Sequence, residues 1–382
     1  MNRSYKILIL SSSFGQGHMA TARALQSAAN ANPGFNIEVD IIDFSKEVNQ
    51  LFDQTSKKLY EFNTKHMPAV YKWLYISSDY AHTPIRIANL LNYPIRRNHL
   101  KKLLQQSQPD LIISNYPIWQ YLALQISKKL FPDVEFATLV TDSISVHSSW
   151  TIPDSDFYLV ANQPTADSLR SLGIDRKKIF ALGYPVHQAF ADSHFDASVI
   201  KTKYHLPDDR PIILFSASAL RTSYVRRVAS AITSHYPHVT LLTIAGRDDE
   251  LYETIRDDAV WTLPHALLLG WTEDMQQLIR ASDIIITKAG GSTVMECIAA
   301  EKPIIINKII PGQEEGNAEL VSEFGLGKIA RKSSEIVAAI EDITQHYSTY
   351  LQQLKLQSRP QAAYEILQFL QERLTQTTNK ES

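Results

Sequence analysis

The sequence has little of what marks secreted, membrane-spanning or nucleic-acid-binding proteins. It contains one cysteine, Cys297, so no disulfide can form within the chain and nothing indicates an oxidising compartment. No stretch of it approaches the roughly 18 consecutive apolar residues that a membrane-spanning helix needs. The net charge of -2 gives no overall electrostatic reason to expect a nucleic-acid partner. We therefore expect a cytoplasmic protein that does not bind nucleic acid and that contacts any membrane only peripherally.

Short apolar segments alternate with amphipathic ones along the whole chain. This pattern is typical of parallel sheets joined by crossover helices, and a length of 382 residues suggests two domains at roughly 150 residues each. The sequence thus predicts an α/β protein with two Rossmann-like, doubly wound domains. The expected strands are residues 6–10, 36–42, 111–114, 136–140 and 157–160 in the first half, and 211–215, 240–244, 266–269, 283–287 and 303–307 in the second.

The domain boundary is expected where a polar stretch ends, shortly before a new buried strand begins at Pro211. We divide the chain into residues 1–195, 196–347 and 348–382. The third part is a C-terminal helical stretch, about 348–374, that we expect to pack back on the first domain, followed by a short tail. Because ligands of open parallel sheets bind beyond the carboxyl ends of the strands, both domains should present their functional loops to a central cleft.

The loop after the first strand contains two glycines and a histidine, and it opens an amphipathic helix expected over residues 19–30. Gly15 and Gly17 allow a sharp turn and a close approach to a ligand. A histidine in the first turn of a helix has a lowered pKa, and a neutral imidazole suits a general base. His18 is therefore a candidate catalytic residue. The alternative is that it caps the helix or fills the loop.

The same loop also satisfies the dinucleotide-binding fingerprint G-x-G-x-x-G/A. Gly15, Gly17 and Ala20 supply its three positions, and Asp40 or Asp43 follows about twenty residues later to bind a ribose. A nicotinamide-dependent oxidoreductase is therefore an alternative. The fingerprint alone is weak, and this alternative leaves the motifs of the second half unexplained.

A second motif, residues 287–296, follows an expected buried strand. Two glycines provide a tight turn, and the hydroxyl side chains after them open a helix whose exposed amides can bind phosphate oxygens. Glu296 lies one turn further, where its carboxylate can accept hydrogen bonds from ribose hydroxyls. Alternatively, Glu296 only stabilises the first helical turn or forms a capping box with Thr293. The candidate ligands here are Gly290, Gly291, Ser292, Thr293 and Glu296.

A third motif, residues 311–317, combines an amide and two carboxylates in a loop punctuated by proline and glycine. Gln313, Glu314 and Asn317 offer donors and acceptors that can bind sugar hydroxyls. The alternative is a solvated turn that leads into a helix.

Together, four segments resemble the family of monogalactosyldiacylglycerol synthases and processive diacylglycerol glucosyltransferases, inverting enzymes of the GT-B fold. The segments are residues 17–25, Thr141–Asp142 with His147 and Trp150, residues 287–296 and residues 311–317, in the family's order over most of the chain. The resemblance implies UDP-glucose or UDP-galactose as donor and diacylglycerol or a related lipid as acceptor. We expect no cofactor, and no metal, since the sequence shows no cluster with metal-ligand spacing.

The resemblance also implies roles for individual residues. His18 is the catalytic base or positions the acceptor, Asp142 receives the proton, and Glu296 binds the ribose. The other implied contacts are Gly17, His147 and Trp150 on the acceptor side, and Gly290, Gly291, Ser292, Thr293, Gln313, Glu314 and Asn317 on the donor side.

One departure from the family concerns the donor phosphates. Where the family has a glycine-rich turn after the first strand of the second domain, this chain has the sequence Ser-Ala-Ser-Ala-Leu-Arg at residues 216–221. Side chains there limit the approach of the backbone to a ligand, although Ser216 and Arg221 can contact phosphate in another way. A nucleotide-sugar-binding protein that has lost catalysis is therefore a further alternative.

Residues 51–102 carry nine basic and three acidic side chains, a local charge of +6. Aromatic residues such as Trp73 are interleaved with the cations, which include Lys57, Lys58 and Lys65. Such a surface suits anionic lipid headgroups, at about 1 kcal/mol for each basic residue near the membrane. We expect it to bind the inner face of the cell membrane. The alternative is that the aromatic residues are core and the cations their solvated rim.

Overall fold

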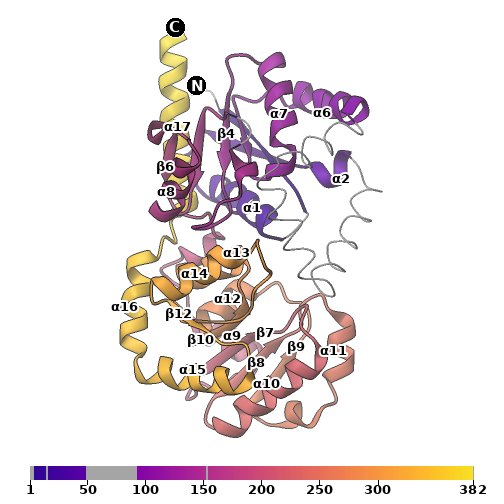
Figure 1. The fold of residues 1–382 in the computed structure, drawn as a ribbon, viewed down its shortest axis with the longest axis vertical. Coiled ribbons are helices and arrows are strands. Elements are labelled where there is room, and N and C mark those ends of the chain that lie inside the picture. The colour runs from indigo at the N-terminus through magenta and orange to yellow at the C-terminus, as the bar shows by residue number, and fades with distance from the viewer. Residues whose placement is uncertain (1–3, 14–15, 49–92, 152–153, 382) are drawn as a thin grey trace. The chain divides into compact units, whose positions relative to one another are not determined.

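The structure, a computed structural model, describes residues 4–13, 16–48, 93–151 and 154–381. These residues form two α/β units (Figure 1). The first unit comprises Met1–Gln188, Pro311–Gly316 and Gln361–Ser382, and the second comprises Ala189–Ile310 and Asn317–Pro360. Lys57, Lys58, Lys65 and Trp73, predicted to contact the membrane, lie outside the described residues.

The first unit is built on a parallel sheet with the strand order β2-β1-β3-β4-β5-β6. Its strands are β1 (Tyr5–Ser11), β2 (Ile37–Asp43), β3 (Leu111–Ser114), β4 (Glu135–Leu139), β5 (Phe157–Val160) and β6 (Ile179–Ala181). Its helices are α1 (Gln16–Ala31), α2 (Phe44–Val48), α6 (Tyr93–Ser107), α7 (Pro117–Leu130), α8 (Gln163–Ser171) and α17 (Ala362–Glu381), with the 3-10 turns η1 (Ser148–Trp150) and η2 (Arg176–Lys178).

Alternation along β1 shows how helices cover both faces of this sheet. Ile7 and Ile9 pack with apolar side chains of α1 and α17, whereas Leu8 and Leu10 pack with those of α6 and α7. Successive side chains of a strand point to opposite faces, so a strand that is apolar throughout must be covered on both. With both faces covered by helices, a ligand can reach the sheet at the carboxyl ends of its strands.

The C-terminal segment differs from the single helical stretch expected over residues 348–374. It forms two helices, α16 (Tyr347–Gln357) and α17, and only α17 belongs to the first unit. There the Arg373 guanidinium donates to both oxygens of the Glu135 carboxylate, at 2.6 and 2.5 Å. The break covers residues 358–361 and contains Pro360. Because proline disfavours a helical conformation in the residue before it, the chain leaves the helix there.

The second unit contains a parallel sheet with the order β12-β11-β10-β7-β8-β9. Its strands are β7 (Ile212–Ser216), β8 (Thr240–Ile244), β9 (Ala266–Leu269), β10 (Ile284–Lys288), β11 (Ile304–Lys308) and β12 (Gly327–Ile329). The remaining elements are α9 (Ala197–Lys203), α10 (Thr222–His235), α11 (Asp249–Ile255), α12 (Met275–Ala281), α13 (Gly291–Ala299), α14 (Glu315–Glu323) and α15 (Ser333–Gln345), with η3 (Gln188–Phe190) and η4 (Ala259–Thr262).

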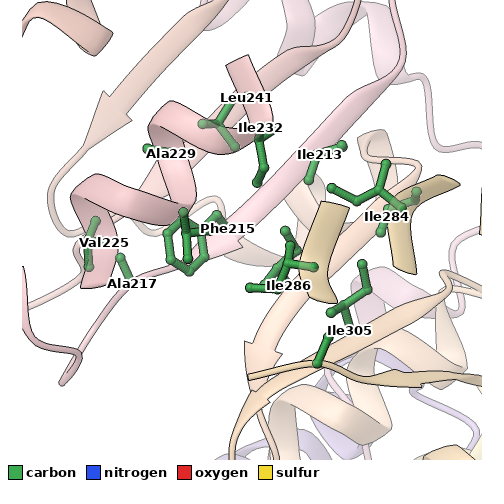
Figure 2. Close-up of a cluster of buried hydrophobic side chains, with 14 of the residues drawn as sticks. Ile213, Phe215, Ala217, Val225, Ala229, Ile232, Leu241, Ile284, Ile286 and Ile305 are labelled. Atoms are coloured by element: carbon green, nitrogen blue, oxygen red, sulfur yellow. The ribbon is translucent and has the colours of Figure 1, made fainter. Parts of the chain in front are cut away.

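A cluster of apolar side chains fills one side of this second sheet (Figure 2). Phe215 of β7 is fully buried there and packs with Val225 and Ala229 of α10, while Ile286 of β10 and Ile305 of β11 extend the cluster. Burial of side chains of this size contributes about 1.5–3 kcal/mol each to the free energy of folding. This packing holds α10, the helix that follows the β7 loop, against the sheet.

The prediction of an α/β fold with two such sheets is confirmed. The ten expected strands lie within one residue of the observed ones. The two strands that were not predicted, β6 and β12, have three residues each and lie at sheet edges. The division between the units falls after Gln188, whereas we expected it after residue 195. No helix in the described part of the chain is long and apolar enough to cross a membrane.

The loop after β7 keeps a tight turn without glycine. Ala219 adopts a left-handed conformation, with a φ of 61°. Its carbonyl oxygen accepts a hydrogen bond from Lys308 Nζ at 2.9 Å, and its N–H donates to Asp248 Oδ2 at 3.4 Å. A non-glycine residue in this region crowds the following carbonyl, at a cost of roughly 1–2 kcal/mol. Two side chains of opposite charge thus hold a turn for which glycine is better suited.

We expect Ala219→Gly to stabilise the second unit by up to about 1 kcal/mol, because removal of Cβ relieves this crowding. For a unit of this size that corresponds to a rise of about 2–4 °C in the melting temperature. Ala217→Gly is the matched control, since Ala217 is buried in the same loop without a positive φ, and glycine there should destabilise. Calorimetry measures both, and a lower melting temperature for Ala219→Gly would contradict the strain.

Candidate functional site

Each sheet contains a point where its strand order reverses. In the first unit β2 and β3 lie on opposite sides of β1, and in the second β8 and β10 lie on opposite sides of β7. Ligands of doubly wound sheets bind beyond the carboxyl ends of the strands at such a switch point. The described segments there are residues 12–13, 16–18 and 115–116 in the first unit, and residues 217–221 and 289–293 in the second.

His18 lies in the first turn of α1, at the switch point of the first sheet, with Gly17 directly before it. The amide of Asn115 donates to the main-chain oxygen of His18 at 2.6 Å and to Thr21 Oγ1 at 2.9 Å. The Nδ1 atom of His18 lies 3.0 Å from Thr141 Oγ1. These bonds tie the start of α1 to the ends of β3 and β4.

Aromatic rings surround the imidazole of His18. The ring of Tyr116 meets it edge-on with centroids 5.1 Å apart, and the Trp150 ring lies at 6.1 Å. Burial lowers the pKa of His18 to about 4, against the smaller opposing effect of a hydrogen bond to the backbone of Asn115. The sequence argument ascribed the lowered pKa to the helix terminus, whereas burial is the larger cause in the structure. His18 is neutral at pH 7 in either case.

Asp142 follows β4 and is held by Trp150. The indole Nε1–H donates to Asp142 Oδ2 at 2.6 Å. Burial raises the pKa of Asp142 to about 6, although this bond and one from the backbone of His147 act in the opposite direction. Trp150 therefore contacts both candidate catalytic residues: its ring is tilted at 49° to that of His18, and its N–H holds Asp142.

His147 shapes the turn that carries Trp150. Its Nδ1 accepts a hydrogen bond from the backbone N–H of Ser149 at 3.1 Å, so that nitrogen must bear a lone pair. The buried amide of Gln120, on α7, donates to the carbonyl oxygens of Ser149 and Trp150, both at 3.0 Å. His147 and Gln120 therefore fix the backbone of the turn that carries Trp150, a positioning role that sequence reasoning had not assigned to either.

In the second unit the glycine motif forms the predicted turn and helix start. Gly290 is the N-cap of α13, and its N–H donates to the Lys288 carbonyl at 2.8 Å. Gly291, Ser292 and Thr293 form the first helical turn and are partly exposed. The buried side chain of Asn317 donates to the Ala289 carbonyl at 2.9 Å, so it supports this turn from behind.

Glu296 is the sixth residue of α13, beyond its first turn. Both alternatives for it are therefore wrong: α13 has no acidic residue in its first turn, and its N-cap is Gly290 and not Thr293. Burial raises the pKa of Glu296 to about 7. The carboxyl group is partly buried, and its oxygens can accept hydrogen bonds from ribose hydroxyls.

The other predicted donor contacts differ in exposure. Gln313 is exposed and Glu314 is buried, with an exposure of 5%. Ser216 ends β7 and is partly exposed, and Arg221 is an exposed residue at the N-cap position of α10, where its side chain makes no capping bond.

The sequence argument missed two residues that contact His18, Asn115 and Tyr116, and it gave no role to Thr141, which it had placed in a motif. The only signal of Asn115 and Tyr116 is position, since they directly follow β3. Strand ends in a parallel sheet share one edge, so polar residues there are candidates even without a motif.

The acids required by the dinucleotide alternative are engaged within the first unit. Asp43 Oδ1 accepts a hydrogen bond from the Ser13 N–H at 3.1 Å, inside the loop itself. Asp40 forms an ion pair with Lys6 at 3.3 Å. Both carboxylates thus already have partners within the first unit, and a ribose would have to compete with these partners. This argues against a nicotinamide enzyme.

Comparison with known proteins agrees with these features. Residues 18–186 match the model of the monogalactosyldiacylglycerol (MGDG) synthase family, and residues 218–370 match the glycosyltransferase family 28 C-terminal domain. The chain is 29% identical to a processive diacylglycerol beta-glucosyltransferase of Staphylococcus carnosus, covering 93% of this chain and 90% of that protein. It is 27% identical to the chloroplastic monogalactosyldiacylglycerol synthase of Spinacia oleracea, covering 97% and 73%.

The fold is shared with MurG of Acinetobacter baumannii. The two superpose with a TM-score of 0.60 at 13% identity, covering 96% of this chain and 99% of that one. The predicted GT-B fold is therefore confirmed.

We expect Trp150→Phe to raise the pKa of Asp142 from about 6 by roughly one pH unit or more. The indole N–H stabilises the ionised carboxylate, so its loss favours the protonated form, and a bond of this kind contributes about 1.5–3 kcal/mol. The measurement is an NMR titration of labelled aspartate carboxyl carbons. Trp119→Phe, which alters a ring that packs on Phe44, should leave the midpoint unchanged. An equal midpoint in Trp150→Phe and wild type would refute the effect.

Proposed function

The chain belongs to the family of monogalactosyldiacylglycerol synthases and processive diacylglycerol glucosyltransferases, and on this basis we propose that it is an inverting, UDP-sugar-dependent glycosyltransferase. The donor is UDP-glucose or UDP-galactose, and the acceptor is the hydroxyl of diacylglycerol or a related membrane lipid. The observation that carries the proposal is a neutral, partly buried histidine and a carboxylate of raised pKa that both contact Trp150 at a switch point.

In the proposed reaction His18 takes the proton of the acceptor hydroxyl while its oxygen attacks the anomeric carbon. If Nδ1 of His18 donates to Thr141 Oγ1, the lone pair of Nε2 is left to accept that proton. The proton then moves to Asp142, because a pKa of about 6 exceeds one of about 4 and the transfer is downhill. Thr141 is thus a positioning residue that orients the ring of His18.

We assign the UDP part of the donor to the second unit. The diphosphate lies at the start of α13, where the amides of the first turn and the positive end of the helix stabilise the charge that grows as UDP leaves. Glu296 binds the ribose. We assign the sugar to Gln313 and Glu314, whose segment Pro311–Gly316 belongs to the first unit. Ser216 and Arg221, at the carboxyl end of β7, flank the same switch point.

A catalytically altered nucleotide-sugar-binding protein is the second candidate, because residues 216–221 depart from the glycine-rich turn of the family. The turn at Ala219 is nevertheless retained by the bonds from Lys308 and Asp248, which supports an intact donor site. Incubation of the protein with labelled UDP-glucose or UDP-galactose and diacylglycerol vesicles separates the two candidates. Formation of a β-linked glycolipid supports transfer, whereas UDP binding without any product supports the altered protein.

We expect His18→Ala to lower turnover by about 10²–10⁴-fold, the usual contribution of general-base assistance. The affinity for UDP should barely change, because UDP is assigned to the other unit, and calorimetry measures it separately. His194→Ala, which alters an exposed histidine of the second unit, serves as the control. Near-normal turnover of His18→Ala on a verified acceptor would mean that His18 is structural, and a parallel loss of UDP affinity would place the donor in the first unit.

We further propose that the protein docks as a peripheral protein on the cytoplasmic face of an anionic membrane through the +6 segment, residues 51–102. Replacing Lys57, Lys58, Lys65 and Lys72 with glutamine should reduce binding to anionic liposomes strongly at low salt and less at high salt, since salt screens exposed charges. Sedimentation with liposomes measures the binding. If the variant sediments as well as wild type does, the membrane-binding surface lies elsewhere.

A further inference from the structure

The carboxyl edge of the second sheet carries two lysines level with each other. Lys288 ends β10, Lys308 ends β11, and the two are register partners. Up to Thr287 the register would pair Lys288 with Asn307, but a shift in the ladder pairs it with Lys308 instead. Neighbouring strands lie only about 4.8 Å apart, and like charges opposite each other destabilise a sheet. Irregularities of this kind are frequent beside binding sites.

Both lysines are connected to the loops at the switch point of this sheet. Lys308 Nζ donates to the carbonyl oxygen of Ala219, in the loop after β7, at 2.9 Å. The main-chain oxygen of Lys308 accepts from the Ala289 N–H at 2.8 Å, directly before α13. The ammonium group of Lys308 thus spans from β11 to β7, and Lys288 lies on the strand between them.

Asn307, directly before Lys308 on β11, is the residue that the register shift leaves without a partner on β10. Its side chain is 4% exposed, and neither atom of its amide has a hydrogen-bond partner among the residues that the structure describes. A buried amide without partners is rare in native proteins and costs free energy. An anion with several acceptor oxygens could pair with both lysines and offer acceptors to this amide.

We propose that Lys288 and Lys308 form a cation pair that binds the diphosphate of the nucleotide sugar. Lys308 exchanges the Ala219 carbonyl for a phosphate oxygen, so that binding of the donor also changes what holds the loop after β7. The assignment rests on the proposed function, and it adds to the helix amides two full charges that oppose the charge of the leaving diphosphate.

The test compares UDP and uridine as ligands, by calorimetry and ligand-detected NMR respectively. Lys288→Met and Lys308→Met should each weaken UDP binding about tenfold or more, the effect of losing a charge-assisted hydrogen bond, while uridine binds as in wild type. Lys308→Arg, which keeps the charge, should retain more UDP affinity than Lys308→Met. Lys355→Met, at an exposed position on α16, is the control and should match wild type.

Unchanged UDP affinity in both methionine variants would overturn the assignment, and so would an equal loss of UDP and uridine, which indicates a disturbed loop. If wild type binds neither ligand, the proposed function fails and the lysine assignment fails with it. If wild type binds UDP with the expected lysine dependence but transfers no sugar, only the catalytic part of the proposed function fails.

Discussion

Parallel strand pairing is the constraint on which both candidate sites depend. Because parallel strands end at the same edge, segments separated by about a hundred residues meet there, as His18 does with Asn115 and Thr141. Helices cover the faces of such sheets, which leaves the carboxyl edge for ligands. In each unit the strand order reverses once beside the first strand, and the loops at that reversal carry the residues with functional motifs.

Burial then tunes the groups at these edges in opposite directions. It disfavours the charged form, so it lowers the pKa of His18 and raises those of Asp142 and Glu296. In the first unit, His18 is therefore the weaker base and Asp142 the stronger one. This order suits a proton transfer from His18 to Asp142. Trp150 keeps the two together, and its bond limits how far burial raises the pKa of Asp142.

The loop after β7 shows how a chain can depart from its family and keep a turn. Ala219 occupies a left-handed conformation, and the carboxylate of Asp248 and the ammonium of Lys308 hold its two backbone groups. Asp248 also caps α11 through the Leu251 N–H, so the loop is anchored to an adjacent helix. Hydrogen bonds from two charged side chains thus stabilise a left-handed conformation that glycine adopts without strain.

The sequence by itself determined the fold class, the positions of the buried strands and the loops that carry chemistry, because period and composition are local properties. It missed the edge strands β6 and β12, whose three residues carry too little pattern, and the break at Pro360, although proline signals it. Only the tertiary structure decided that Asn115, Tyr116 and Thr141 surround His18 and that Lys308 is the register partner of Lys288. These relations follow from strand order and register, which arise from pairing between distant segments and leave no trace in the local pattern of either one.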